Sequence, residues 1–292
     1  MSRKPLTDDQ AAKNVFMDNM WKNFFYEEWG ESAFVPETVS HLWERFMNQA
    51  VIIIGAGPSL DRNIEEFCEG YRGGSIVIAT DGAMLDLMHH GFRPDFVITS
   101  EGDGKHTRSD VPTTEDLLTD DVLRFYRNIP LIATTWANQE FIRKWRSYND
   151  NMIYWYVNYH DQYQHYFDEE QHRFPYDTMW PCIRPKVHMV GFHAIALCSS
   201  LMASHVTLLG FDMMSYPDQH HSEHFNMDWD SSRIDLITHY AKALEKFEFE
   251  HGGDFGILTF NCTEGGALQE ANTSAICVPI KTYLEGFQNA AN

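Results

Sequence analysis

The sequence lacks the marks of several protein classes. Its five cysteines are scattered through 292 residues without a C-x-x-C pair, which argues against a disulfide framework and a cysteine zinc site. No apolar run approaches the roughly 20 residues that a membrane-spanning helix needs, and the polar N-terminus has no apolar signal segment. We therefore expect a globular protein of the reducing cytoplasm, with no membrane span.

Basic residues are scarce. Lys and Arg number 22 against 42 Asp and Glu, so the formal net charge is -20. This balance argues against nucleic acid or an anionic membrane as partner, because neutralising phosphates requires clustered Lys and Arg. Small charged substrates remain compatible with it, since a local field can oppose the net charge. The expected partners are a small-molecule donor and an unidentified acceptor, and homo-oligomerisation stays open.

Short apolar runs alternate with helical patterns from residue 51 onward. Strands are expected at 51–54, 75–80, 96–100, 130–135, 152–157, 205–210 and 256–261. Parallel neighbours need crossover connections, and helices supply them. The pattern predicts an α/β protein with a Rossmann-like, mainly parallel sheet and helices on both faces.

Two segments depart from this alternation. Apolar and aromatic residues at helical spacing before residue 50 predict an N-terminal helical cap, so we divide the chain into an extension at 1–49 and a Rossmann-like domain at 50–292. A Tyr- and His-rich insertion near 158–187 interrupts the second part. Such an insertion is either a lid or binding loop, or a surface loop without a functional role that is packed by its own aromatic side chains.

The stretch 51–60 reads as a buried strand followed by a tight turn into a helix. Gly55 and Gly57 lack a Cβ, so their backbone N–H groups can approach a phosphate, while Pro58 and Ser59 lead into the helix. Ser59 is suited to cap that helix and to present its hydroxyl. A third glycine is replaced by Leu60 and no Gly-Lys-Ser/Thr follows, which weakens a dinucleotide fingerprint and excludes a P-loop.

Acidic residues follow the second and third expected strands. Asp81 stands where an NAD enzyme would hold the ribose, which keeps a dehydrogenase open as an alternative. Glu101 and Asp103 could join Asp81 in holding Mg²⁺ beside substrate phosphates. The plain alternative is a solvated acidic loop.

The strand at 205–210 leads to Asp212 and then to a histidine-rich loop. His221 and His224 are candidates for a catalytic base or acid, because the ordinary pKa of His suits proton transfer near neutral pH. A transition-metal site and a bland loop are the alternatives. We place Asp212 with these histidines in the catalytic group.

A polar turn follows the last expected strand. Asn261, Thr263 and Gly265 can offer side chains and backbone N–H groups to a ligand, and the alternative is an ordinary glycine turn. Carboxyl ends of parallel strands meet at one edge of the sheet, so these residues are expected near the 55–59 turn.

Four stretches together resemble one family. They are VIIIGAGPSL, IVIATDGAMLDLMHHGFRPDFVITSEGD, VTLLGFDM and NCTEGGA. They are similar to the 6-hydroxymethylpterin diphosphokinase MptE-like family, which includes motility accessory factor glycosyltransferases. The first turn also resembles that of bacterial sialyltransferases that use CMP-sialic acid. The resemblance implies a Rossmann-like transferase domain that binds a nucleotide or nucleotide sugar.

Two chemistries occur in the family. One is pyrophosphoryl transfer from ATP to a pterin, which needs Mg²⁺, and the other is glycosyl transfer from a CMP-activated sugar. The N-terminal addition and the Asn-Cys-Thr-Glu-Gly-Gly-Ala ending favour the second. In that interpretation the 55–59 turn holds the donor phosphate, Asp81 contacts the ribose or base, and His221 or His224 is the base. A non-catalytic nucleotide-binding protein is the third alternative.

Overall fold

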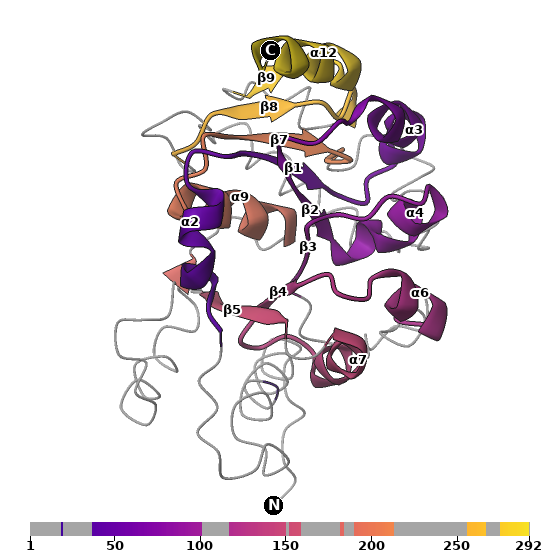
Figure 1. Cartoon of the computed structure of the whole chain (residues 1–292), viewed down its shortest axis with the longest axis vertical. Helices are drawn as coiled ribbons and strands as arrows, with labels where there is room; N and C mark the ends of the chain where they lie inside the picture. Colours follow the sequence, from indigo (N-terminus) through magenta and orange to yellow (C-terminus); the bar gives the residue numbers. More distant parts are fainter. Residues whose placement is uncertain are drawn as a thin grey trace, which may run out of the picture.

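The fold is described from a computed structural model of the chain (Figure 1). The residues that the structure describes are 19, 37–100, 117–149, 152–158, 182–183, 190–212, 256–266 and 275–291.

A nine-stranded sheet runs through the protein in the order β6-β5-β4-β3-β2-β1-β7-β8-β9. Every described pair of neighbouring strands is parallel. The strands are β1 (Ala50–Ile54), β2 (Ile76–Thr80), β3 (Phe96–Thr99), β4 (Leu131–Thr134), β5 (Ile153–Asn158), β6 (Cys182–Ile183), β7 (His205–Leu209), β8 (Thr259–Asn261) and β9 (Ile276–Cys277). The predicted parallel α/β fold is confirmed, and β6 and β9 were not foreseen.

Helices cover both faces of the sheet, as predicted. The 3-10 turn η2 (Val39–Leu42) with α2 (Trp43–Phe46) and α9 (Val190–Ser200) lie on one side, and α3, α4, α6 and α7 lie on the other (Figure 1). The bounds of the other helical elements are α3 (Leu60–Gly70), η3 (Asp81–Ala83), α4 (Met84–His89), α6 (Asp120–Phe125), α7 (Gln139–Asn149) and α12 (Ile280–Ala291). None of the helices in the described ranges is both long and apolar enough to cross a membrane. The helix expected near 229–250 lies outside the described residues.

The central strand β1 packs against helices on both of its faces, which gives a fold of three layers: helices, sheet and helices. Val51 and Ile53 pack on one face with α9, whereas Ile52 and Ile54 pack on the other with α3. All four side chains are fully buried, which matches the expectation of a strand buried on both faces. Burial stabilises the fold by about 1.5–3 kcal/mol for each such side chain.

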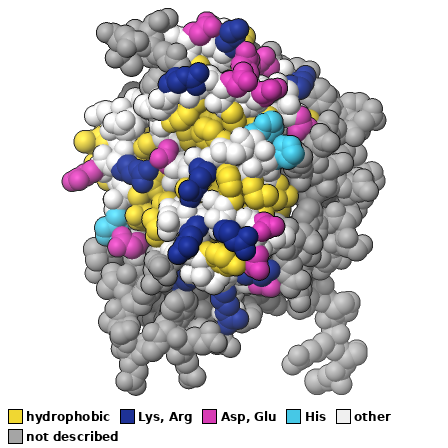
Figure 2. All heavy atoms as spheres, turned by 45° about the vertical axis from the view of Figure 1, so that its right-hand side comes forward, with side chains coloured by type: hydrophobic (Ala, Val, Ile, Leu, Met, Phe, Trp, Pro, Cys, Tyr) yellow, Lys and Arg dark blue, Asp and Glu magenta, His cyan; other side chains and the backbone are white. Residues whose placement is uncertain are grey.

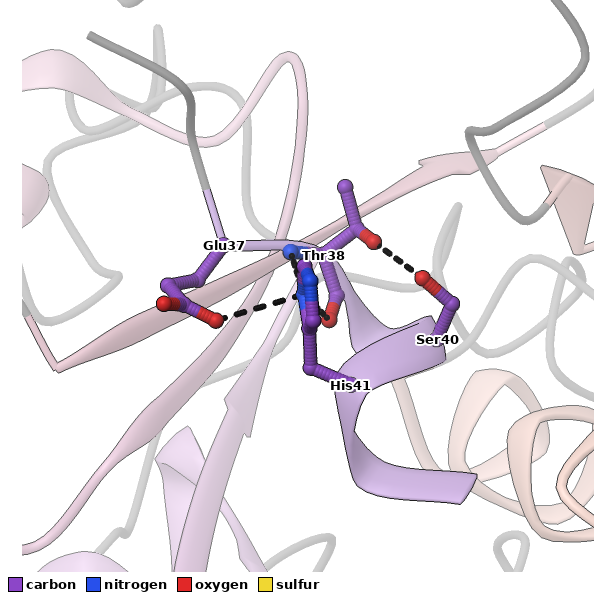
Figure 3. Close-up of polar contacts among 4 residues, drawn as sticks. All are labelled: Glu37, Thr38, Ser40 and His41. Carbon is purple, nitrogen blue, oxygen red and sulfur yellow. Dashed lines mark hydrogen bonds and ion pairs between the residues drawn. The ribbon is translucent and has the colours of Figure 1, made fainter. Parts of the chain in front are cut away.

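The described part of the N-terminal extension is short and lies against the sheet. Thr38 forms a parallel bridge with Trp155, whose N–H donates to the carbonyl of Glu37 at 2.9 Å. Nδ1 of His41 lies 3.1 Å from the backbone nitrogen of Thr38 and 3.2 Å from a carboxylate oxygen of Glu37 (Figure 3). Apolar residues of η2 and α2 join the core on the α9 face. The helical pattern before residue 37, Asn19 apart, lies outside the described residues, and the division at residue 49 stays a prediction.

The strand order places a topological switch point beside β1. Strands β2 to β6 extend the sheet on one side of β1, and β7 to β9 extend it on the other. The connections after β1 and β7 therefore diverge at their carboxyl ends. Ligands of open α/β sheets bind at such a point.

Basic side chains gather among acidic and apolar ones on the face that carries α3, α4, α6 and α7 (Figure 2). Exposed arginines of this region include Arg62, Arg72, Arg93 and Arg124. Basic side chains are therefore exposed on this face in spite of the negative net charge.

We expect His205 to couple pH to the docking of α12, through its contact with Tyr283. Its Nε2 lies 2.9 Å from the hydroxyl of Tyr283, and burial lowers the pKa of His205 below its ordinary value. The unfolded chain thus binds this proton at higher pH than the folded chain, and stability should fall as the pH drops below about 6.5. His205→Gln should flatten the fall in melting temperature between about pH 7.5 and pH 5.5. A slope as steep in His205→Gln as in wild type would refute the coupling.

Candidate functional site

Two turns meet at the switch point. The 55–59 turn follows β1, and the 210–212 turn follows β7. The N–H of Gly55 donates to the carbonyl of Leu209, and the N–H of Gly57 donates to the carbonyl of Gly210, both at 2.8 Å. The turns thus continue the β1–β7 pairing beyond the ends of the strands.

Glycine is required where the turns touch. A Cβ on Gly57 would lie 2.2 Å from Asp212 Oδ2 and 2.6 Å from the carbonyl oxygen of Gly210. Gly210 has φ +72°, and a Cβ there would lie 2.2 Å from the carbonyl oxygen of Gly55. These glycines therefore serve the close approach of one turn to the other.

Asp212 binds the first turn directly. Its Oδ2 accepts hydrogen bonds from the backbone N–H of Ser59 at 2.9 Å and from the Ser59 hydroxyl at 2.7 Å. Ser59 is the N-cap residue of α3, but its side chain does not cap that helix as we expected. Instead, the carboxylate of Asp212 lies at the positive end of α3, where a negative charge is favourable.

The other oxygen of Asp212 has no hydrogen-bond partner within the part of the chain that the structure describes. Asp212 is 1% exposed, and Oδ1 is buried with it. Burial raises the pKa of this carboxyl, while the bonds from Ser59 and the charge of Arg62 act in the opposite direction. A buried carboxylate oxygen without a partner is costly, so it marks a place where a hydrogen-bond donor would be held.

The turn after β8 forms the third side of the site. The hydroxyl of Thr263 accepts a hydrogen bond from the N–H of Phe211 at 3.1 Å, and Oδ1 of Asn261 accepts one from the N–H of Thr263 at 3.1 Å. Gly265 follows, half-buried, and a Cβ on the adjacent Gly266 would lie 2.3 Å from the carbonyl oxygen of Asp212. The structure therefore brings the predicted residues after β1, β7 and β8 together.

Asp81 lies apart from this group, on the β2 side of β1. Its carboxylate accepts hydrogen bonds from the Thr99 hydroxyl at 2.6 Å and from the N–H of Gly82 at 2.9 Å. The hydroxyl of Tyr156 lies 2.8 Å from Nδ1 of His193, and burial together with the charge of Asp81 holds the pKa of Tyr156 well above its usual range. Asp81 is thus held in place at the carboxyl edge, and its contact with a ribose or base stays a prediction.

Several predicted site residues lie outside the described residues. They are Glu101, Asp103, His221 and His224. Within the described ranges, no three His, Cys, Asp or Glu side chains are grouped so that they could hold a metal ion. The proposed base and the Mg²⁺ ligands therefore stay predictions.

Sequence reasoning missed two residues of the site. The side-chain amide of Asn63 donates to the carbonyls of Cys262 and Thr263, at 3.2 Å and 3.3 Å, and so ties α3 to the turn after β8. Arg62, exposed on the first turn of α3, brings a positive charge near Asp212. The spacing of Asn63 four residues after Ser59, on one helix face, was the available signal.

The sheet order and the three turns define an α/β protein of the Rossmann-like type, with its candidate site at the switch point. The model of the family described as 6-hydroxymethylpterin diphosphokinase MptE-like matches residues 29–218, and the chain belongs to this family. Membership supports a transferase role.

One solved structure with a similar fold is a MAf glycosyltransferase from Magnetospirillum magneticum AMB-1. The TM-score is 0.56 at 12% sequence identity, and the match covers 96% of this chain. This chain spans 41% of the length of that glycosyltransferase chain. A search of curated proteins found no match.

Proposed function

We propose that the protein is a nucleotide-dependent transferase that moves a glycosyl group from a nucleotide-activated sugar of the CMP type to an acceptor. The observation that carries this proposal is the junction of Ser59 and Asp212 at the switch point, where a helix N-terminus, a buried carboxylate and a polar turn converge. Open α/β sheets bind nucleotides at this position. Similarity in fold to a glycosyltransferase across nearly the whole chain adds support.

The residues would divide the work by position. The turn at Gly55, Gly57, Pro58 and Ser59 would line the donor site from the β1 side. Asn261, Thr263 and Gly265 would line it from the β8 side, with Asp212 between the two turns in contact with the substrate. These positions suit an elongated ligand that lies across the ends of β1, β7 and β8.

Further predicted groups would complete the reaction. Asp81 would approach the ribose or base from the β2 side. His221 or His224 would accept the proton of the acceptor hydroxyl while the bond from the sugar to the nucleotide phosphate breaks.

The second candidate is pyrophosphoryl transfer from ATP to 6-hydroxymethyl-7,8-dihydropterin. The description of the family favours it. It requires Mg²⁺ to neutralise the triphosphate, and Glu101 and Asp103 are the predicted ligands. Asp81, the one of the three predicted Mg²⁺ ligands that the structure describes, already accepts bonds from Thr99 and Gly82, so Mg²⁺ would depend on additional ligands.

A thermal-shift panel separates the candidates. CMP, CDP, UDP, ATP and NAD are each added with and without Mg²⁺, and a ligand at 100 times its Kd should stabilise the protein by about 2.7 kcal/mol. We expect CMP to raise the melting temperature without Mg²⁺. Mg²⁺-dependent stabilisation by ATP would support the kinase, and stabilisation by NAD alone would support a dehydrogenase.

If none of the nucleotides raises the melting temperature, the transferase proposal is refuted. Binding of CMP without turnover of any CMP-sugar would instead support a non-catalytic nucleotide-binding protein. Replacement of His221 and His224 by Ala, with turnover unchanged, would remove their proposed role.

A further inference from the structure

The anion position at the start of α3 is already filled by the chain itself. The N–H groups of Gly55, Gly57 and Ser59, which could otherwise hold a phosphate, donate to Leu209, Gly210 and Asp212. The N–H of Leu60 donates to the carbonyl of Gly57 at 2.9 Å, and Pro58 has no N–H. A phosphate at this turn would have to displace these acceptors.

Asp212 also provides the negative charge that a phosphate would bring. Its Oδ2 takes both the backbone N–H and the hydroxyl of Ser59, and its carboxylate lies at the N-terminus of an eleven-residue helix. A phosphate bound beside this carboxylate would meet like-charge repulsion in a buried environment. The position therefore disfavours a second anion.

Among the described residues, three buried polar atoms of α3 and of the turns after β7 and β8 have no hydrogen-bond partner: Oδ1 of Asp212, Oδ1 of Asn63 and Nδ2 of Asn261. These residues are 1%, 4% and 2% exposed. The orientation of both amides is fixed, because Asn63 donates to two carbonyls and Asn261 accepts from Thr263. A hydroxyl group, which donates one hydrogen bond and can also accept, is the kind of group that Oδ1 of Asp212 and Nδ2 of Asn261 require, whereas Oδ1 of Asn63 needs a separate donor.

We propose that Asp212 is the resident anion of the α3 N-terminus and that this subsite holds a sugar hydroxyl of the ligand, with the phosphate kept outside. The identification of that sugar as the ribose of a nucleotide rests on the proposed function. Arg62, exposed on the first turn of α3, brings a positive charge near Asp212. The 55–59 turn, whose sequence resembles a phosphate-binding turn, thus lies beside the uncharged sugar of the ligand.

Pyrophosphate binding to the whole chain, measured by calorimetry, tests the resident anion. Asp212→Ala removes the charge and frees both Ser59 donors, so pyrophosphate should bind about tenfold more tightly than to wild type. Asp212→Asn removes only the charge and should gain less. Asp61→Asn, which neutralises an exposed acid in the first turn of the same helix, is the matched control and should gain little. If Asp212→Ala does not fold, the test is whether Asp212→Asn binds pyrophosphate more tightly than Asp61→Asn does.

The hydroxyl is tested with cytidine and 2′,3′-dideoxycytidine. Wild type should prefer cytidine by about tenfold, and Asp212→Ala should lose that preference, because the ribose hydroxyl then has no carboxylate to donate to. Equal pyrophosphate affinity in wild type and the Asp212 variants would overturn the proposal. If pyrophosphate behaves as expected but wild type binds neither cytidine nor CMP, the nucleotide function fails while the resident anion stands.

Discussion

Replacing Gly210 with alanine should lower the free energy of unfolding by about 3 kcal/mol. A left-handed backbone costs a residue with a Cβ roughly 1–2 kcal/mol, and the new Cβ would meet the backbone of Gly55, which adds overpacking of a similar size. Gly210 has φ +72°, and the carbonyl oxygen of Gly55 would lie 2.2 Å from that Cβ. The melting temperature should therefore fall by about 6–12 °C.

Gly286→Ala is the matched control for this experiment. Gly286 is exposed on α12, and a Cβ there would meet nothing within 4 Å. Alanine also favours helix over glycine, so this variant should be stabilised by up to about 1 kcal/mol. If Gly210→Ala has the same melting temperature as wild type, the turns after β1 and β7 do not touch as described.

Gly57→Ala should greatly weaken the binding of CMP while leaving most of the sheet intact. The new Cβ would lie 2.2 Å from Asp212 Oδ2 and 2.6 Å from the carbonyl oxygen of Gly210, so the 210–212 turn must move away from Ser59. In catalysis a misplacement of about 1 Å can cost roughly 100-fold in rate, and we expect CMP affinity to fall by a similar factor. Calorimetric titration of CMP, with circular dichroism as the check of folding, measures it. Wild-type affinity in a folded Gly57→Ala protein would contradict this role of Asp212.

The sheet could be predicted because its longer strands are visible in the sequence as short runs of apolar residues. Val51 and the three isoleucines after it are apolar without interruption, which is typical of a strand buried on both faces of a parallel sheet. Strands β6 and β9 have two residues each, too few for any periodicity. β6 pairs with β5 and β9 pairs with β8, and so short a segment shows in the sequence only through such a partner.

The contents of the site were harder to predict than its place. Sequence position put Ser59, Asp212 and Asn261 at the carboxyl edge, and the structure has them there. The bond between Ser59 and Asp212 joins residues 153 positions apart, which no local pattern reports.

The role of the glycines was ambiguous for a related reason. A glycine indicates that something approaches the backbone closely, but the sequence does not reveal what approaches. At Gly57 the expected neighbour was a phosphate, and the structure has Asp212 and the carbonyl of Gly210 there. The same absence of a Cβ serves either contact.

The central claim, that a nucleotide binds at the switch point between the turns after β1 and β7, is tested most directly by a crystal structure of the chain with CMP. We predict CMP across the 55–59 and 210–212 turns, with a ribose hydroxyl within hydrogen-bonding distance of Oδ1 of Asp212. CMP bound away from both turns would contradict the account.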